Sequence, residues 1–151
     1  MIIDINFFNQ THNFFKDVSK EYLLPNLVNL EKDQVSEKSD HSLVTQFDLI
    51  IENELIQYFK EKGFDNIISE ENNSDLLAYN HYLTIDPIDG TRSFVAGHKD
   101  FGTLIALLYK KKPVLGIINC PAHKERWIGV ENQITTLNGK NIKNYSTKGT
   151  A

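Results

Sequence analysis

The sequence of 151 residues has a single cysteine and no long apolar run, and each of these shortages excludes a class of protein. Cys120 has no second cysteine to pair with, so no disulfide can form within the chain, which suits a reducing cytoplasm. No stretch approaches the roughly 20 apolar residues of a membrane-spanning helix. The first residues, Met1 to Asp4, reach a charge too soon for a secretory signal. We therefore expect a cytoplasmic protein with no membrane partner.

Basic charge is also scarce, because the net charge is -4 at pH 7. Proteins that bind nucleic acid without sequence preference carry basic patches, so we expect no nucleic-acid partner. The only basic run, Lys110 to Lys112, precedes Pro113 and is predicted to be the solvated tip of a hairpin. The hydrophobic content of 40% is ordinary for a soluble globular protein, and the length suffices for one domain with a real core.

Apolar residues recur at helical spacing in two parts of the chain. The first runs from about Asn6 to Lys32, where Pro25 is expected to kink the helix or divide it in two. The second begins at Thr45, and Asp48 three positions later is close to a capping box. Gly63 is expected to end this second helix.

The remaining sequence consists mainly of strand-type runs separated by polar turns. Residues 35–43 are polar and predicted to form a loop, and Asn138-Gly139 is a tight-turn signal. The predicted strands are Asn66–Ser69, Tyr82–Ile85, Thr103–Tyr109, Val114–Asn119, Glu125–Val130 and Gln133–Leu137. Helices followed by mostly antiparallel strands predict an α+β fold, a layered α/β sandwich.

The most informative segment is Asp86-Pro87-Ile88-Asp89-Gly90-Thr91, which follows a predicted buried strand. Its two carboxylates and its backbone carbonyls are the hard oxygen ligands that Mg2+ prefers. The Gly-Thr pair could open a helix whose first N–H groups face an anion. Glu70-Glu71 ends the neighbouring predicted strand, so the two acidic loops together favour a two-metal site. Each loop by itself is equally a solvated turn, since pairs of acids at this spacing are common by chance.

These residues also carry a resemblance. Asp86 to Thr91, followed by Phe94, resembles the signature of the inositol monophosphatase family. Glu70-Glu71, the stretch from Lys38 to Asp48, and the segments 101–106 and 113–116 resemble further family segments, in the same order. Segments 91–94, 102–105, 125–129 and 135–139 look most like its bacterial histidinol-phosphatase branch. The resemblance implies the N-terminal domain of a layered sandwich of the inositol monophosphatase and sugar phosphatase type over residues 1–145, with a tail at 146–151.

The resemblance further implies a Mg2+-dependent phosphomonoester hydrolase that uses a metal-activated water. Its substrate would be a small phosphorylated metabolite of the histidinol-phosphate or inositol-phosphate type. The implied roles are a first metal at Glu70, Asp86 and the carbonyl of Ile88, a second metal at Asp86 and Asp89, the attacking water at Glu71 and Thr91, the phosphate at the N–H groups of Gly90 and Thr91, and a mobile loop region with Lys38 and Asp48.

Several of these residues have a purely structural alternative. Lys38 is equally explained as a solvated charge, and Asp48 as part of a helix cap. Glu71 could be a charge near the site rather than a base, and Arg92 could pair with a surface acid instead of substrate. Cys120 follows an apolar run and is expected to be a buried thiol rather than a nucleophile. The five histidines show no ligand-like spacing and are treated as structural or solvated.

Members of the family normally continue about as far again, through a part with a Trp-Asp motif that completes the second metal site. This sequence has no Trp-Asp pair, because Trp127 is followed by Ile128. Three hypotheses therefore stand. The chain is a phosphatase, an inactive remnant that binds Mg2+, or a half-enzyme completed by a separately encoded C-terminal half. An apolar face left exposed would also favour self-association, for example as a homodimer.

Overall fold

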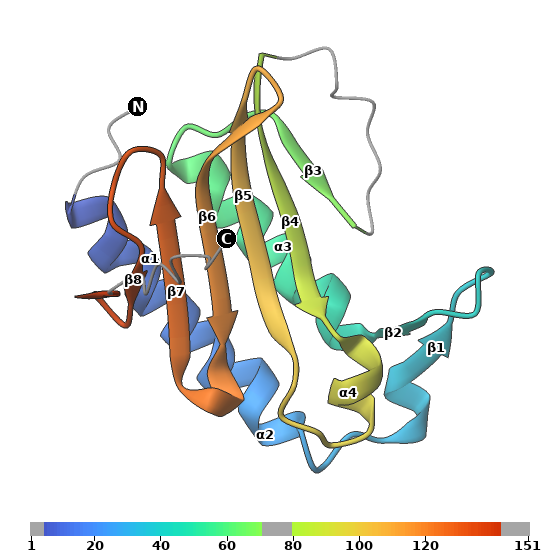
Figure 1. Cartoon of the computed structure of the whole chain (residues 1–151). Coiled ribbons are helices and arrows are strands. Elements are labelled where there is room, and N and C mark those ends of the chain that lie inside the picture. The colour runs from blue at the N-terminus through green and yellow to red at the C-terminus, as the bar shows by residue number, and fades with distance from the viewer. Residues whose placement is uncertain (1–4, 71–79, 143–151) are drawn as a thin grey trace, which may run out of the picture.

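A computed structural model describes residues 5–70 and 80–142, which form a twisted sheet with helices on one face (Figure 1). The sheet has seven strands in the order β3-β4-β5-β6-β7-β8-β9. Their bounds are Ile67–Ser69, His81–Asp89, Gly102–Tyr109, Lys112–Cys120, Glu125–Val130, Thr136–Leu137 and Lys140–Asn141. Strands β3 and β4 run parallel, and each later neighbour is antiparallel. The α+β sandwich expected from the sequence is therefore confirmed.

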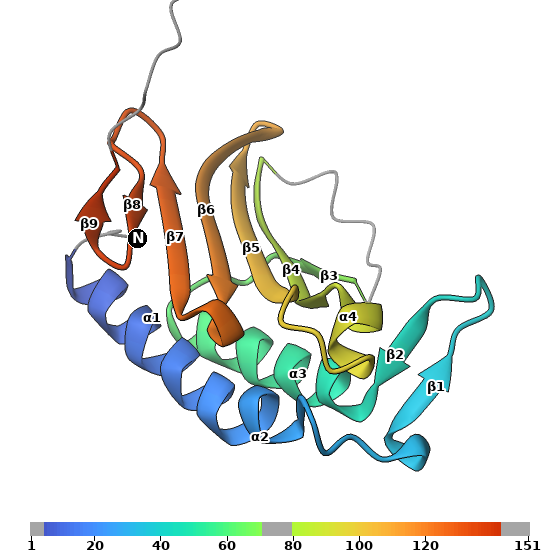
Figure 2. The ribbon, with the colours of Figure 1, turned by 60° about the horizontal axis from the view of Figure 1, so that its bottom comes forward.

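The helical layer consists of two long helices that cross the same face of the sheet (Figure 2). They are α1, Ile5–Val18, and α3, Gln46–Glu61; the shorter pieces are a π-helix at Ser19–Leu23, α2 at Leu24–Asn26, α4 at Thr91–Val95, and single 3-10 turns at Lys32–Gln34 and Pro121–His123. Among the residues that the structure describes, no helix covers the other face of the sheet. No helix in this part of the chain is long and apolar enough to cross a membrane.

The core lies between the helices and the sheet, because both layers present apolar side chains there. Buried aromatic and aliphatic residues of α1 and α3 meet the inward face of β4, β5 and β6. The main contributors are Phe7, Phe15, Phe47, Ile51, Leu55, Phe59, Leu83, Ile85, Ile105, Leu115 and Ile117. Each fully buried side chain of this size contributes about 1.5–3 kcal/mol relative to exposure. Along β4 the side chains alternate, so Leu83 and Ile85 are buried in this core while Thr84 and Asp86 lie on the opposite face.

The first helical stretch is shorter than expected and changes from an α-helix to a π-turn before Pro25. Helix α1 ends at Val18, and a π-turn over Ser19–Leu23 leads into α2. The Ser19 hydroxyl donates to the carbonyl oxygen of Phe15 at 2.6 Å, a local bond that competes with the regular ladder. Pro25 then stands in the first turn of α2, where its missing N–H costs little. Helical residues run without a gap from Ile5 to Asn26, so Pro25 does not divide this stretch, and its last helical residue is Asn26 rather than about Lys32.

The stretch 35–43, predicted to be a loop, instead contains two short strands. Strand β1, Val35–Glu37, pairs antiparallel with β2, Leu43–Thr45. Between them a tight turn is closed by the Lys38 N–H, which donates to the carbonyl of Ser42 at 2.8 Å. Asp40 accepts hydrogen bonds from the N–H and hydroxyl of Ser42, and these bonds lower the pKa of its carboxyl. Three-residue strands are too short to show a clear alternation of apolar and polar residues, which is why the sequence missed this hairpin.

The predicted hairpin tip, the Asn138-Gly139 turn and the helix end at Gly63 are confirmed, whereas the last predicted strand and Cys120 differ from expectation. The Lys110 and Lys111 residues form the β5–β6 turn with φ of 49° and 64°, and Asn138 and Gly139 join β8 to β9 with φ of 51° and 77°. Gly63, at φ 85°, follows Lys62, the C-cap of α3. The last predicted strand shortens to β8, Thr136–Leu137. Cys120 is half-buried rather than buried, and burial, followed by the charges of Glu125 and Asp89, raises the pKa of its thiol. The proposed boundary at residue 145 and the tail at 146–151 lie outside the described residues.

Candidate metal and phosphate site

The acidic segment is part of strand β4 and disrupts its pairing. The strand was expected to end at Ile85, but it continues to Asp89. Asp86 pairs with Leu104 and Asp89 with Gly102, so the register with β5 shifts between the two acids. Pro87 occupies this irregularity, where its missing N–H leaves no gap in a regular ladder. The carbonyl oxygen of Pro87 accepts a hydrogen bond from the Thr103 hydroxyl at 2.9 Å, which fixes the bulge to β5.

The parallel pairing of β3 with β4 brings a third carboxylate to this place. Ser69 lies opposite Ile85, and the N–H of Glu70 donates to the carbonyl of Ile85 at 3.1 Å. Parallel strands end at the same edge of a sheet, so Glu70 and Asp86 become neighbours although the chain separates them. Glu71 lies outside the described residues.

Asp86 is the electrostatic centre of the cluster. Its pKa is raised to about 7, first by burial, then by the charge of Glu70 and a side-chain hydrogen bond with it, and then by the charges of Asp89 and Asp48. Its Oδ1 atom is buried and has no hydrogen-bond partner among the residues that the structure describes. A buried carboxylate oxygen without a donor is costly. A cation is the partner that would remove both this cost and the repulsion among the acids.

The donor set fits a hard divalent cation in kind. Glu70, Asp86 and Asp89 offer carboxylate oxygens, and the carbonyl of Ile88 lies between the two aspartates along the chain. Within residues 5–70 and 80–142, no three His, Cys, Asp or Glu side chains already stand at the spacing of a metal site. One reason is visible at Glu70, whose Oε1 lies 3.4 Å from the Lys38 ammonium. These residues therefore fit a divalent cation in ligand type and in their place in the fold. Their described side chains do not yet stand at coordination distance from one point.

A buried network links helix α3 to the end of β4. Thr45 caps the helix: its hydroxyl accepts from the N–H groups of Phe47 and Asp48 at 3.2 and 3.4 Å. The Oδ2 atom of Asp48 accepts from the N–H and hydroxyl of Thr45, both at 2.7 Å, so the predicted capping box is confirmed. Asp48 lies in the first turn of α3, and its Oδ1 faces the Thr91 hydroxyl at 3.3 Å. That hydroxyl also lies 2.9 Å from the carbonyl oxygen of Ile88.

The loop between β1 and β2 faces this cluster. Lys38 lies in that loop and reaches Glu70, while the Arg92 guanidinium donates to the carbonyl of His41 at 2.7 Å. Asp48 forms the helix cap and also contacts Thr91, whereas its role in a loop region of the site stays a prediction. Arg92 contacts a backbone carbonyl of the loop, not a surface acid, among the hydrogen bonds of the described residues.

Helix α4 begins directly after the acids, at a glycine that no other residue could replace without strain. Gly90 is the N-cap, with φ 83°, and a Cβ at this position would lie 2.8 Å from the carbonyl oxygen of Asp100. Phe94 is fully buried and packs on Phe47 and Phe101, with ring centroids 6.4 and 5.0 Å away. This anchor fixes α4 to the core directly after Asp89, and the N–H groups of its first turn have no intrahelical partner.

Sequence reasoning missed Glu52, which supports the cluster from behind. Glu52 is buried on α3, one turn beyond Asp48, and accepts a hydrogen bond from the Ser69 hydroxyl at 2.5 Å. Ser69 directly precedes Glu70, so this contact fixes the end of β3 to the helix. The available signal was a charge within the apolar face formed by Ile51 and Leu55.

The fold and the cluster together define an oxygen-rich acidic centre beside the start of a helix. Residues 8–150 match the inositol monophosphatase family, and the chain belongs to that family. Curated relatives are the bifunctional phosphatase IMPL2 of Arabidopsis thaliana and the histidinol-phosphatase of Mycobacterium tuberculosis. The first is 40% identical over 77% of this chain and 34% of the relative. The second is 32% identical over 62% of this chain and 36% of the relative.

Solved structures show the same fold. An inositol monophosphatase from Thermotoga maritima superposes with a TM-score of 0.81 at 23% identity, over 95% of this chain and 55% of the other. An inositol monophosphatase/NADP phosphatase described as a complex with Mg2+ and phosphate gives a TM-score of 0.77 at 22% identity, over 91% and 52%. The chain thus spans about a third of these curated relatives and about half of these solved structures.

Proposed function

We propose that this chain supplies the Mg2+ and phosphate centre of a phosphomonoesterase acting on a small phosphorylated metabolite. The observation that supports this most directly is the buried Oδ1 of Asp86, which lacks a partner among the described residues and is surrounded by the charges of Glu70, Asp89 and Asp48. A bound cation would offset the repulsion among these acids. The relatives support the class of reaction, since both curated proteins named above are phosphatases.

In this proposal Glu70, Asp86 and the carbonyl of Ile88 hold one metal, and Asp86 and Asp89 hold a second. Bound Mg2+ would neutralise the phosphate and lower the pKa of an attacking water. Asp86 must lose its proton to serve as a ligand, so binding is expected to strengthen as pH rises toward 7.

Thr91 is proposed to position the attacking water, with Glu71 as a second contributor. Its hydroxyl has one proton, which it donates to Asp48 or to the carbonyl of Ile88, so its oxygen lone pairs remain available to accept from water. Asp48 is buried and held by Thr45, and it can therefore orient this hydroxyl with little freedom. Donation from the water to Thr91 would point a water lone pair toward the phosphorus atom.

The phosphate group is proposed to bind the N–H groups of Gly90 and Thr91. The left-handed conformation of Gly90 supports this proposal, because it turns the chain between Asp89 and the first residue of α4. Lys38 is proposed to belong to a loop that closes over the site, because it already contacts Glu70 from the β1–β2 turn. Donors at fixed positions stabilise the charge that develops on phosphate oxygens in the transition state.

Histidinol phosphate is the first substrate to test and inositol phosphate the second. The named functions of the relatives support both, and the segments 91–94 and 125–129 resemble the histidinol-phosphatase branch. Because the chain spans about half of the solved relatives, completion of the site by a C-terminal half or by a second copy of the chain belongs to the same proposal.

The test is Mg2+-dependent release of phosphate from each substrate, measured for the chain alone and with an added C-terminal fragment of a relative. Asp89→Asn should abolish release, whereas Glu131→Gln, at an exposed acid directly after β7, should not. Mg2+ binding is measured separately by calorimetry on the same proteins. Equal phosphate release by the parent and Asp89→Asn would overturn the hydrolase proposal. Equal Mg2+ affinity of the two would overturn the metal assignment.

A further inference from the structure

Arg126 is a buried cation on β7, at a distance from the acidic cluster and on the side of the sheet that α1 covers. Only 7% of the residue is exposed. Its Nε and Nη2 atoms donate to Asn119 Oδ1 at 3.1 and 2.7 Å, and its Nη1 donates to the carbonyl oxygen and Nδ1 of His12 on α1. The guanidinium carbon lies 5.2 Å from the centre of the Phe15 ring. Every one of these partners is uncharged or a ring face.

The positive charge of Arg126 therefore has no carboxylate partner. Among the described residues, no acid lies within ion-pair distance of it. The adjacent Glu125 accepts from Trp127 Nε1 at 3.1 Å instead. Burial lowers the pKa of Arg126 to about 10, which is the expected response of a cation removed from water without an opposite charge. A guanidinium has five N–H bonds, and the contacts above use four, leaving one on Nη2.

His12 adds a second available donor. Arginine can only donate, so His12 Nδ1 accepts and the proton of the neutral ring is on Nε2. Burial, then the charges of Arg126 and Lys16, lower the pKa of His12, which is consistent with a neutral ring. Within residues 5–70 and 80–142, no acceptor contacts the Nε2–H group, which can donate to a ligand beside the guanidinium.

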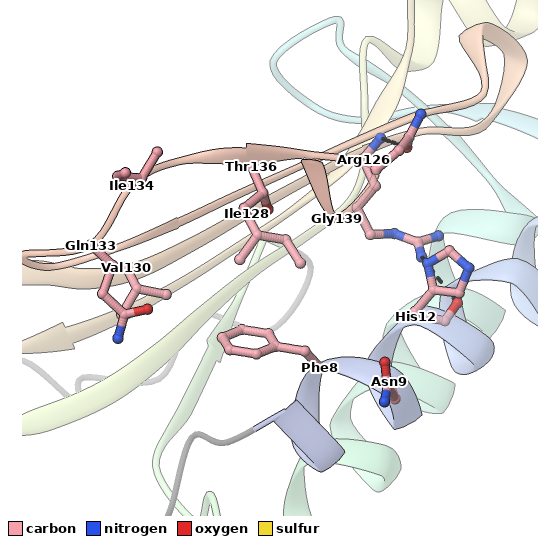
Figure 3. A pocket seen from close by; sticks show the side chains of 11 residues that line it. Phe8, Asn9, His12, Arg126, Ile128, Val130, Gln133, Ile134, Thr136 and Gly139 are labelled. Atoms are coloured by element: carbon pink, nitrogen blue, oxygen red, sulfur yellow. Dashed lines mark hydrogen bonds between the residues drawn. The ribbon is translucent and has the colours of Figure 1, made fainter. Parts of the chain in front are cut away.

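Two cavities meet at Arg126 and His12. One, of about 210 Å³, lies between α1 and the β7–β8 strands and is mostly apolar; Phe8, Ile128 and Val130 point into it (Figure 3). The other, of about 380 Å³, is lined by four basic residues, Lys16, Lys20, Lys124 and Arg126, and by one acid, Glu125, whose carboxylate accepts from Trp127. A concentration of cations at one place is unexpected in a chain with a net charge of -4.

We infer that this pair of cavities, the Arg126 site, binds a small organic anion. Its phosphate or carboxylate would lie among Arg126, Lys16, Lys20 and Lys124, and its apolar body would extend toward Phe8 and Ile128. An anionic group would satisfy the remaining Nη2–H of Arg126 and the Nε2–H of His12, and it would compensate the buried charge. The acidic cluster cannot do this, because it repels anions unless a cation is bound. The Arg126 site is thus separate from the proposed catalytic site in both charge and position.

The test uses the full chain in EDTA, so that no divalent metal recruits phosphate to the acidic cluster. Inorganic phosphate and phenyl phosphate are titrated separately while backbone amide shifts are followed by NMR. Saturable shifts should gather at residues 12, 16, 20, 124 and 126, and phenyl phosphate should bind more tightly than inorganic phosphate. Lys16→Ala and Lys124→Ala should each weaken binding by about five- to tenfold, the effect of removing one nearby charge. Lys60→Ala, an exposed lysine on α3, is the matched control and should leave the affinity unchanged.

Two further variants separate the parts of the site. Ile134→Ser changes an exposed residue of the apolar cavity and should reduce the preference for phenyl phosphate without weakening inorganic phosphate. Arg126→Lys, checked for an unchanged NMR fold, should lose binding of both probes. Unchanged affinity in both lysine variants, or shifts confined to residues 90–92, would overturn the proposal. A carboxylate probe, benzoate, that binds as tightly as phenyl phosphate would identify a site for organic carboxylates as well as phosphates.

Discussion

The hydroxyl of Thr91 lies 3.3 Å from Oδ1 of Asp48, a contact between the first turn of α4 and the first turn of α3 over 43 positions of sequence. The same hydroxyl lies 2.9 Å from the carbonyl of Ile88, a proposed metal ligand. Asp48 is 2% exposed and its other oxygen is fully engaged by Thr45. The helix cap therefore determines where the hydroxyl of Thr91 can point.

This relationship predicts that Thr91→Val will remove turnover while leaving Mg2+ binding nearly intact. Valine keeps the shape of threonine but cannot accept a hydrogen bond from water, so the phosphatase rate should fall by about 10²- to 10³-fold. Thr91→Ser keeps the hydroxyl and should retain most of the rate. Initial rates and calorimetric Mg2+ affinities of the three proteins provide the check. A valine variant with full activity would remove Thr91 from the mechanism.

Asp86 predicts a pH-dependent stability in the absence of divalent metal. Its pKa is raised from 3.8 to about 7 in the folded protein, so the folded state holds a proton that the unfolded state has lost between these values. Stability should therefore fall as pH rises from about 4 to 7 and should level off above 7. Because Asp86 is only half-buried, the loss is discounted for solvent screening to about 2 kcal/mol.

The measurement is urea unfolding in EDTA at several pH values, for the parent and Asp86→Asn. The asparagine variant should lack this part of the pH dependence and should be the more stable protein at pH 8. Added Mg2+ should stabilise the parent at pH 8 and leave Asp86→Asn almost unchanged. A parent whose stability increases from pH 5 to 7 in EDTA would contradict the assigned environment of Asp86.

Gly90 and Gly63 provide a matched pair for backbone strain. Both have positive φ, 83° and 85°, but a Cβ at Gly90 would contact the carbonyl of Asp100 at 2.8 Å, whereas nothing lies within 4 Å at Gly63. Gly63→Ala should cost about 1 kcal/mol for the left-handed conformation alone. Gly90→Ala should cost about 2–4 kcal/mol, because the backbone must also move. Thermal unfolding of both variants tests this order, and equal losses would show that the contact with Asp100 is unimportant.

The helix cap at Thr45 should contribute to both stability and site geometry. Thr45→Ala removes the hydroxyl that contacts Phe47, Asp48 and the Asp48 carboxylate, and it should destabilise the fold by about 1–2 kcal/mol. Thr45→Ser retains these bonds and should lose much less. If Asp48 is released as expected, the alanine variant also loses phosphatase rate at a temperature where it remains folded. Circular dichroism and rate measurements at one temperature separate the two effects.

The sequence predicted those parts of the fold whose signals are local. Thr45 with Asp48, Gly63, and Asn138 with Gly139 each act through bonds or dihedral angles within a few residues, and the structure confirms them. The β1–β2 hairpin is stabilised by pairing across a turn, and strands of three residues are too short for their sequence pattern to predict that pairing. The change from α-helix to π-turn after Val18 has one local feature, the hydrogen bond from the Ser19 hydroxyl to the carbonyl of Phe15, and the spacing of apolar residues does not predict it.

The candidate site divides in the same way. Asp86 and Asp89 are three positions apart, so their motif could be recognised in the sequence, and Glu70 followed from the expected order of strands. The contacts of Asp48 with Thr91 and of Glu52 with Ser69 join residues 43 and 17 positions apart. Such contacts depend on how α3 packs on the sheet, which the spacing of residues does not specify. Glu71 stays a prediction, since it lies outside the described residues.

The alternation along β4 has a consequence for how this protein can change. Leu83 and Ile85 belong to the helix-covered core, whereas Asp86 lies on the opposite face of the same strand. Replacing that acid leaves no hole between sheet and helices, so its substitution alters charge without removing packed volume. Evolution or a designer could therefore alter the proposed metal site at this strand end independently of the apolar layer that keeps the domain folded.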